Sequence, residues 1–121
     1  MRSISLKHLS KEELLQWQYD KDFQLDQVSH NCDLIKYIHY PDKEIQLCAV
    51  KQDITVIRYI DRPHKEVQLY VVRENGDLLK YIHDPVEKVC RDAVYQRPLA
   101  ITYVNIEKYP EVYNLYVFLC K

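Results

Sequence analysis

Apolar side chains recur along this chain with a period of 22 residues. We call a set of positions 22 residues apart a repeat column. The best-kept columns are Tyr37, Tyr59, Tyr81 and Tyr103; Ile35, Ile57, Leu79 and Ile101; and Val28, Val50, Val72 and Val94. A fixed period of this length indicates short repeated units that stack on one another and bury their apolar sides together.

The period divides the chain into repeats with an atypical start and end. Proline closes three successive units, at Pro41, Pro63 and Pro85. The expected organisation is one domain over residues 1–121: an N-terminal cap over 1–22, four repeats over 23–44, 45–66, 67–88 and 89–110, and a C-terminal half-repeat cap over 111–121 whose register slips by one or two residues.

Whether each unit contains helices or strands is decided by one pair of columns. Residues 67–72 and 78–79 around Asn75-Gly76 also fit a β-hairpin. The corresponding pairs in the four units are Asn31-Cys32, Asp53-Ile54, Asn75-Gly76 and Arg97-Pro98. Asn and Asp are favoured N-caps, and proline is favoured at the first helical position, whereas Ile54 and Pro98 suit a tight hairpin poorly.

Each unit is therefore predicted to hold two short helices, over about 42–51 and 54–60 in the second unit. Helices this short are stable only when they stack. The expected fold is all-α: a small α-solenoid of about four helical-hairpin repeats with N- and C-terminal capping helices.

Both ends depart from the repeat. Ser10 and Glu13 form a capping-box pattern before an apolar run, and Leu9 is placed for a hydrophobic staple. We expect Trp17 and Tyr19 to cover the first unit. The strongly apolar residues 112–120 predict either a terminal cap or an edge for a homodimer.

Composition excludes several classes of function. The formal net charge is -1, which gives no bulk electrostatic attraction for nucleic acid, and the single glycine rules out Gly-rich phosphate loops. The first residues show no secretory signal and no segment is long enough to span a membrane, so we expect a cytoplasmic protein. None of the four cysteines forms a C-x-x-C pair, so we expect no metal, and only Cys32, at a helix start, is a candidate reactive thiol.

The repeat resembles a known family. The segments Ala49-Val50-Lys51-Gln52-Asp53 and Val72-Arg73-Glu74-Asn75-Gly76-Asp77-Leu78-Leu79-Lys80-Tyr81-Ile82, with Asp42-Lys43-Glu44-Ile45 and His64-Lys65-Glu66-Val67, are similar to a two-helix repeat family of unknown function found in viruses, protists and host-associated bacteria. The fourth unit departs from that pattern at Arg97-Pro98 and Thr102. The resemblance implies an α-helical, host-facing binding protein and supplies no catalytic residues.

One column carries a cation immediately before the regular tyrosine. We call Lys36, Arg58 and Lys80 the cation ladder, which is either a solvated helix face or a stripe that docks an acidic partner. The regular tyrosines are expected to be core spacers with the hydroxyl at the edge. Tyrosines outside the repeat rule are better candidates for a partner surface, and we select Tyr40, Tyr70 and Tyr95.

The leading hypothesis is a non-enzymatic protein–protein interaction module, with a phage- or parasite-encoded inhibitor that occludes a host protein as its narrower form. A nucleic-acid-binding adaptor that uses the cation ladder is the alternative. An enzyme of unknown reaction that uses His39 or His83 is the third hypothesis, and no catalytic motif, cofactor site or metal site supports it.

Overall fold

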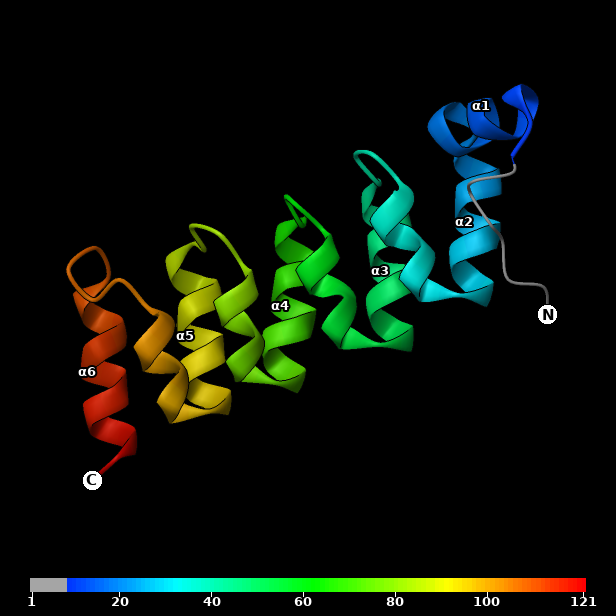
Figure 1. Cartoon of the computed structure of the whole chain (residues 1–121). Helices are drawn as coiled ribbons and strands as arrows, with labels where there is room; N and C mark the ends of the chain where they lie inside the picture. The colour runs from blue at the N-terminus through cyan, green and yellow to red at the C-terminus, as the bar shows by residue number, and fades with distance from the viewer. Residues whose placement is uncertain (1–8) are drawn as a thin grey trace.

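The computed structural model describes residues 9–121, which fold as a row of stacked helical hairpins (Figure 1). Five α-helices of ten residues each follow a first, nine-residue helix, and four 3-10 helices alternate with them. The elements are α1 (Lys11–Tyr19), α2 (Lys21–His30), η2 (Cys32–Tyr37), α3 (Lys43–Gln52), η3 (Ile54–Tyr59), α4 (Lys65–Glu74), η4 (Gly76–Tyr81), α5 (Glu87–Gln96), η5 (Pro98–Tyr103) and α6 (Pro110–Leu119). The predicted all-α repeat fold is confirmed.

The second helix of every unit is a 3-10 helix of six residues. Its start follows the prediction, because the side chains of Asn31, Asp53 and Asn75 each accept a backbone N–H two residues downstream at 3.0–3.1 Å. In the fourth unit Arg97 makes no such bond and Pro98 opens the helix instead. The tighter helix type allows six residues to complete about two turns before the chain returns to the next α-helix.

The helices form two rows with the core between them. Successive α-helices pack against one another, and so do successive 3-10 helices. The α-helices start at residues 21, 43, 65 and 87, two residues before the expected repeat boundaries, and α6 starts at 110, which locates the register slip as one extra residue. The valine column Val28, Val50, Val72 and Val94 is fully buried. The side chains five residues before a column position are also fully buried in the later helices: Ile45, Val67, Val89 and Val112.

Two glutamines of one repeat column, the buried Gln46 and the half-buried Gln68, tie a loop to the α-helix that follows it. Gln46 Nε2 donates to the carbonyl oxygen of Pro41 at 2.8 Å, and Gln68 makes the same bond to Pro63. Gln46 Oε1 also accepts the backbone N–H of His64, at the N-cap of the next helix, at 2.9 Å. A buried amide that satisfies two backbone groups fixes the distance between neighbouring units.

Units three and four are in close contact at Gly76. A Cβ at this position would lie 2.3 Å from the carbonyl oxygen of Ala93, although the same column holds Cys32, Ile54 and Pro98 elsewhere. The Gly76 N–H donates to Gln96 Oε1 at 2.6 Å. Gly76, which in the sequence also fits a β-hairpin turn after Asn75, is therefore required by the contact between two units.

The two ends differ. At the N-terminal end the capping box is present, with Glu13 N–H donating to Ser10 Oγ at 3.2 Å. Trp17 is 5% exposed and its ring meets the edge of Phe23 at 5.4 Å between centroids. Tyr19, expected to help cover the first unit, is 79% exposed and does not. At the C-terminal end α6 packs on α5 and leaves its opposite side uncovered (Figure 1).

Candidate protein-binding face

The 3-10 helices present one repeated pair of side chains to solvent. Their third and fourth residues point into the core, buried everywhere except at the half-buried Ile101, and their fifth and sixth residues are exposed. The exposed pairs are Lys36-Tyr37, Arg58-Tyr59, Lys80-Tyr81 and Thr102-Tyr103. We call this row of pairs the ladder face. Because the 3-10 helices pack side by side, the cation ladder and the regular tyrosines lie on one side of the solenoid.

Each ladder cation lies against an aromatic ring. Lys36 Nζ is 5.2 Å from the ring centroid of Tyr37 and 5.7 Å from that of Tyr59, in the next unit. Lys80 Nζ is 5.2 Å from the Tyr81 ring. Arg58 stacks at 4.8 Å over Tyr59 and donates from Nη2 to its hydroxyl at 2.9 Å, which raises the pKa of the guanidinium further. Cation–π contacts of this kind restrict the long side chains before any partner arrives.

The prediction that the regular tyrosines are core spacers is wrong. Their side chains are 37–48% exposed. The reason is that each tyrosine is the last residue of its 3-10 helix. With three residues per turn, it lies on the same side of the helix as the buried third residue, but one turn closer to the helix end. Its base covers the edge of the core and its ring extends over the surface.

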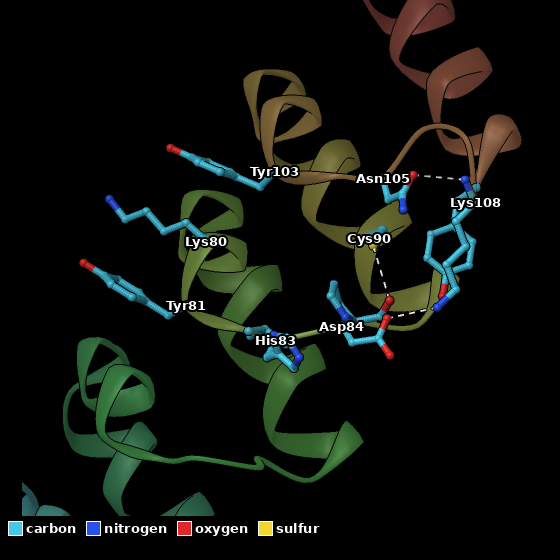
Figure 2. Close-up of a pocket in the computed structure, with 11 residues that line it drawn as sticks. Lys80, Tyr81, His83, Asp84, Cys90, Tyr103, Asn105 and Lys108 are labelled. Carbon is cyan, nitrogen blue, oxygen red and sulfur yellow. Dashed lines mark hydrogen bonds and ion pairs between the residues drawn. The ribbon is translucent and has the colours of Figure 1, made fainter.

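Two equivalent cavities open between successive units along the ladder face. One, of about 490 Å³, is lined by Lys80, His83, Asp84, Tyr103 and Lys108 among others, and the other, of about 500 Å³, lies two units earlier with Lys36, His39, Tyr40 and Tyr59 at the matching positions. Figure 2 shows Lys80 and the rings of Tyr81 and Tyr103 extending the same way from the ribbon, with Asp84 turned toward Lys108. Each cavity combines the cation of one unit with the tyrosine of the next.

The loops beside these cavities hold an unusual backbone conformation. Tyr40 and Asp84, 44 residues apart and so in the same column, have φ of 58° and 49°. Residues other than glycine adopt this left-handed region at a cost of roughly 1 kcal/mol or more. Asp84 Oδ1 accepts from Lys108 Nζ at 2.9 Å, whereas Tyr40 is 83% exposed and only meets the His39 ring, at 4.4 Å. Tyr40 is thus an exposed aromatic group beside the ladder, on a strained backbone.

The other two selected tyrosines lie elsewhere. Tyr70 is carried by α4 and is half-buried against the core. Tyr95 is carried by α5, is 71% exposed, and lines a shallow hollow with Arg73, Asp92 and Gln96. Both belong to the α-helical row, so the structure brings only Tyr40 together with the cation ladder.

The ladder cations differ from many other cations of the chain because they have no acidic partner among the described residues. Cations of the α-helical row join neighbouring units: Lys43 to Glu66 at 3.0 Å and Arg73 to Asp92 at 2.8 Å. Among residues 9–121, by contrast, neither Lys36, Arg58 nor Lys80 forms an ion pair. The ladder therefore offers unneutralised positive charge at a regular spacing.

The two candidate histidines lie in separate cavities. His39 and His83 are both exposed; Asp42 and Asp61 line the cavity of His39, and Asp84 lines that of His83. Within the described range, no cluster of three His, Cys, Asp or Glu side chains could hold a metal ion. Burial, with the neighbouring Asp33 and Asp53, raises the pKa of Cys32, which does not favour the thiolate form that a reactive thiol at this helix start would need.

Comparisons with known proteins add no relative: no family model matches the chain, and neither a curated protein nor a solved structure is found similar to it. None of the helices between residues 9 and 121 combines the length and apolar character that a membrane crossing requires.

Proposed function

We propose that this protein is a non-enzymatic protein–protein interaction module that docks an acidic partner on its ladder face. The observation that carries the proposal is the row of ladder cations, each held over a tyrosine ring and none neutralised by an acid among the described residues. Tyrosine and arginine are enriched at protein interfaces, and side chains that are ordered beforehand lose less entropy on binding.

The spacing of the ladder defines the partner. Lys36 touches two rings, so the centroids of Tyr37 and Tyr59 are within about 11 Å of each other, close to the roughly 8–10 Å between packed helices. A partner with carboxylates about 10 Å apart along one line would meet the cations in succession. Three contacts in a row also select against partners whose charges have another spacing.

A rigid face of this kind suits occlusion, and the narrower form of the proposal is an inhibitor that covers a host protein from within the host cytoplasm. The family resemblance supports a host-facing role. Binding by a preformed surface requires no catalytic group.

The test compares two triple variants with the same change in charge. Wild-type protein, Lys36→Glu/Arg58→Glu/Lys80→Glu, and the matched control Lys51→Glu/Lys65→Glu/Lys88→Glu, whose residues are exposed on the α-helices, are used to capture partners from cells in which the protein occurs. We expect the ladder variant to lose the partner while the control retains it and both keep the wild-type helical circular dichroism. Equal capture by the two variants would contradict the proposal.

Nucleic-acid binding is the second candidate, favoured by exposed tyrosine rings next to cations, an arrangement on which bases stack. It predicts salt-dependent affinity for single-stranded RNA or DNA with a slope set by about three phosphate contacts. Binding of an oligonucleotide at low salt by the wild type and the control, but not by the ladder variant, would replace the acidic protein by a nucleic acid as the partner. We expect no such binding, because the net charge is -1.

A further inference from the structure

A cavity of about 600 Å³ lies between α1, at the N-terminal end of the row in Figure 1, and the loop that follows η2. We call it the α1 cavity. Its walls are mainly aromatic and aliphatic side chains: Leu14, Trp17, Tyr19, Tyr37, His39 and Tyr40. No Asp, Glu, Lys or Arg is among the described residues that line it. The size is within the roughly 300–1,000 Å³ of ligand pockets, and the lining suits an apolar group.

The Trp17 indole in the wall of this cavity has an unsatisfied hydrogen-bond donor. Trp17 is 5% exposed, its ring packs on Phe23, and its carbonyl oxygen accepts from Gln24 Nε2. Its Nε1 is buried and has no acceptor among the described residues. Because almost all buried donors are paired, an unpaired one beside a cavity points to an acceptor that a ligand supplies. The N–H is covered in this structure, so binding must turn a covering side chain aside.

The loop that carries Tyr40 supports a ligand at the same place. Tyr40 lines the α1 cavity with a backbone φ of 58°, and its side chain is 83% exposed. Strained residues of this kind cluster at sites that hold ligands. A bulky apolar group in the cavity would cover part of the Tyr40 ring.

The α1 cavity adjoins the first cation of the ladder. His39 and Tyr40 also line the cavity of about 500 Å³ that contains Lys36. Lys36 Nζ lies 5.2 Å from the ring centroid of Tyr37, which lines the α1 cavity as well. An uncharged cavity next to an unneutralised cation is complementary to a segment in which an apolar residue precedes a series of acids.

We propose that the α1 cavity receives a bulky apolar side chain of the acidic partner, that a carbonyl oxygen of the same segment accepts the Trp17 N–H, and that the first acid of the segment pairs with Lys36. This rests on the proposed function, which places the acids on the ladder face. The two parts act differently, because a side chain buried in a pocket slows dissociation, whereas exposed charges mainly speed association.

Blocked synthetic peptides test the proposal, with Trp17 as the reporter. The chain has a single tryptophan, so its fluorescence and one indole N–H signal in the NMR spectrum report on the site. The probe is acetyl-Phe-Ser-Ser-Glu-Ser-Ser-Glu-Ser-Ser-Glu-amide, whose acids are about 9–10 Å apart in an extended chain. We expect it to bind, to shift the indole signal downfield and to slow the hydrogen exchange of the indole. Replacing its phenylalanine by serine should weaken binding at least about tenfold and leave the indole signal unchanged.

Leu14 and Leu15 provide a matched pair of variants. They are adjacent in α1 and 48% and 45% exposed, and of the two only Leu14 lines the α1 cavity. Leu14→Glu is expected to weaken binding of the phenylalanine peptide at least about tenfold, because it puts a charge into an apolar cavity. Leu15→Glu should bind like the wild type. Circular dichroism shows whether each variant is folded, and the comparison of the two peptides on the wild type depends on neither.

Three results would overturn the proposal: no binding of the phenylalanine peptide by the wild type up to about 1 mM, equal affinity for the two peptides, or equal weakening by Leu14→Glu and Leu15→Glu in folded protein. A fourth concerns the chain itself. If removal of residues 1–8 shifts the indole signal upfield and raises the affinity for the peptide, the occupant of the cavity is the N-terminal segment of this chain and the proposal is wrong.

The variant Lys36→Glu/Arg58→Glu/Lys80→Glu separates this proposal from the proposed function. If it binds the phenylalanine peptide as tightly as the wild type does, the acids do not dock on the ladder face and the proposed function fails. If it loses both peptides while the wild type binds them equally, the ladder face stands and the assignment of the α1 cavity alone is wrong.

Discussion

The two ends of the solenoid differ in how the outward side of the last unit is covered. At each end of the described structure, one side of the last hairpin unit has no further hairpin packed on it. At the N-terminal end a separate helix folds across it and buries Trp17, while the remaining outward side of α2 is polar. At the C-terminal end α6 leaves Phe118 70% exposed and Val117 40% exposed. The difference is that α1 partly covers the N-terminal end, whereas the outward side of α6 is uncovered in the described structure.

Helix capping follows the same division. The helices α1, α2 and α3 have N-caps whose side chains bond the first turn, Ser10, Asp20 and Asp42. The helices α4, α5 and α6 begin at His64, Val86 and Tyr109, which make no such bond. Ion pairs between units occur in both halves, for example Lys43 with Glu66 at 3.0 Å and Asp77 with Arg97 at 2.9 Å. The first half thus has local capping in addition to contacts between units, whereas the helices of the second half rely on contacts between units.

The largest expected effect comes from removing the closure itself. Trp17→Ala should lower the free energy of unfolding by about 3–5 kcal/mol, because it removes a large buried ring that packs on Phe23. The comparison is Phe118→Ala at a concentration where the protein is monomeric, which should change it by less than about 0.5 kcal/mol. Urea unfolding followed by circular dichroism measures both. Similar losses for the two variants would mean that the ends are not different.

Removing the first cap should have a smaller effect at the same end. Ser10→Ala abolishes the bond from the Glu13 N–H and is expected to cost about 1 kcal/mol. Hydrogen exchange should then increase in α1 while α4 and α5 stay protected. Uniform loss of protection along the chain would show that α1 does not unfold separately.

Adding a missing cap should have the smallest effect, with the opposite sign. Val86 is the N-cap of α5, is 46% exposed, and leaves the first turn without a side-chain acceptor. Val86→Ser supplies one and is expected to raise the free energy of unfolding by about 0.5–1 kcal/mol. A higher urea midpoint would support the comparison of the two halves. No change or a loss would show that contacts between units already satisfy this helix end.

Much of the fold could be predicted because its signals are local. The 22-residue period, the N-caps Asn31, Asp53 and Asn75, and Pro98 at a helix start are visible in the sequence, and the structure contains each of them. These features depend on the hydrogen-bonding needs of the first helical turn, which neighbouring residues satisfy. Distant contacts do not alter them.

The missed features depend on contacts between units. The sequence does not separate a 3-10 from an α-helix of six residues, because the bonding pattern adjusts to the packing. Gly76 is explained only by the carbonyl oxygen of Ala93, in the next unit. The column Gln24, Gln46 and Gln68 was visible as a polar position with the full period, and that regularity was the signal that could have identified it as structural.

The cation ladder was identified from the sequence, but its arrangement with the tyrosines was not. Adjacent residues in a 3-10 helix diverge by about 120°, so sequence neighbours such as Lys36 and Tyr37 need not meet. They meet because the Lys36 side chain lies over the ring of Tyr37 and also near that of Tyr59. The contact with Tyr59 comes from the neighbouring unit, which the local sequence does not reveal.

Site-specific photocrosslinking tests the central claim most directly. A benzophenone amino acid is placed at Tyr59, in the middle of the ladder face, or at Lys65, exposed on the α-helical row, and the cells that contain the partner are irradiated. The account predicts a covalent protein adduct from position 59, rich in acidic residues at the crosslinked segment, and none from position 65. Adducts formed from position 65 and absent from position 59 would contradict it.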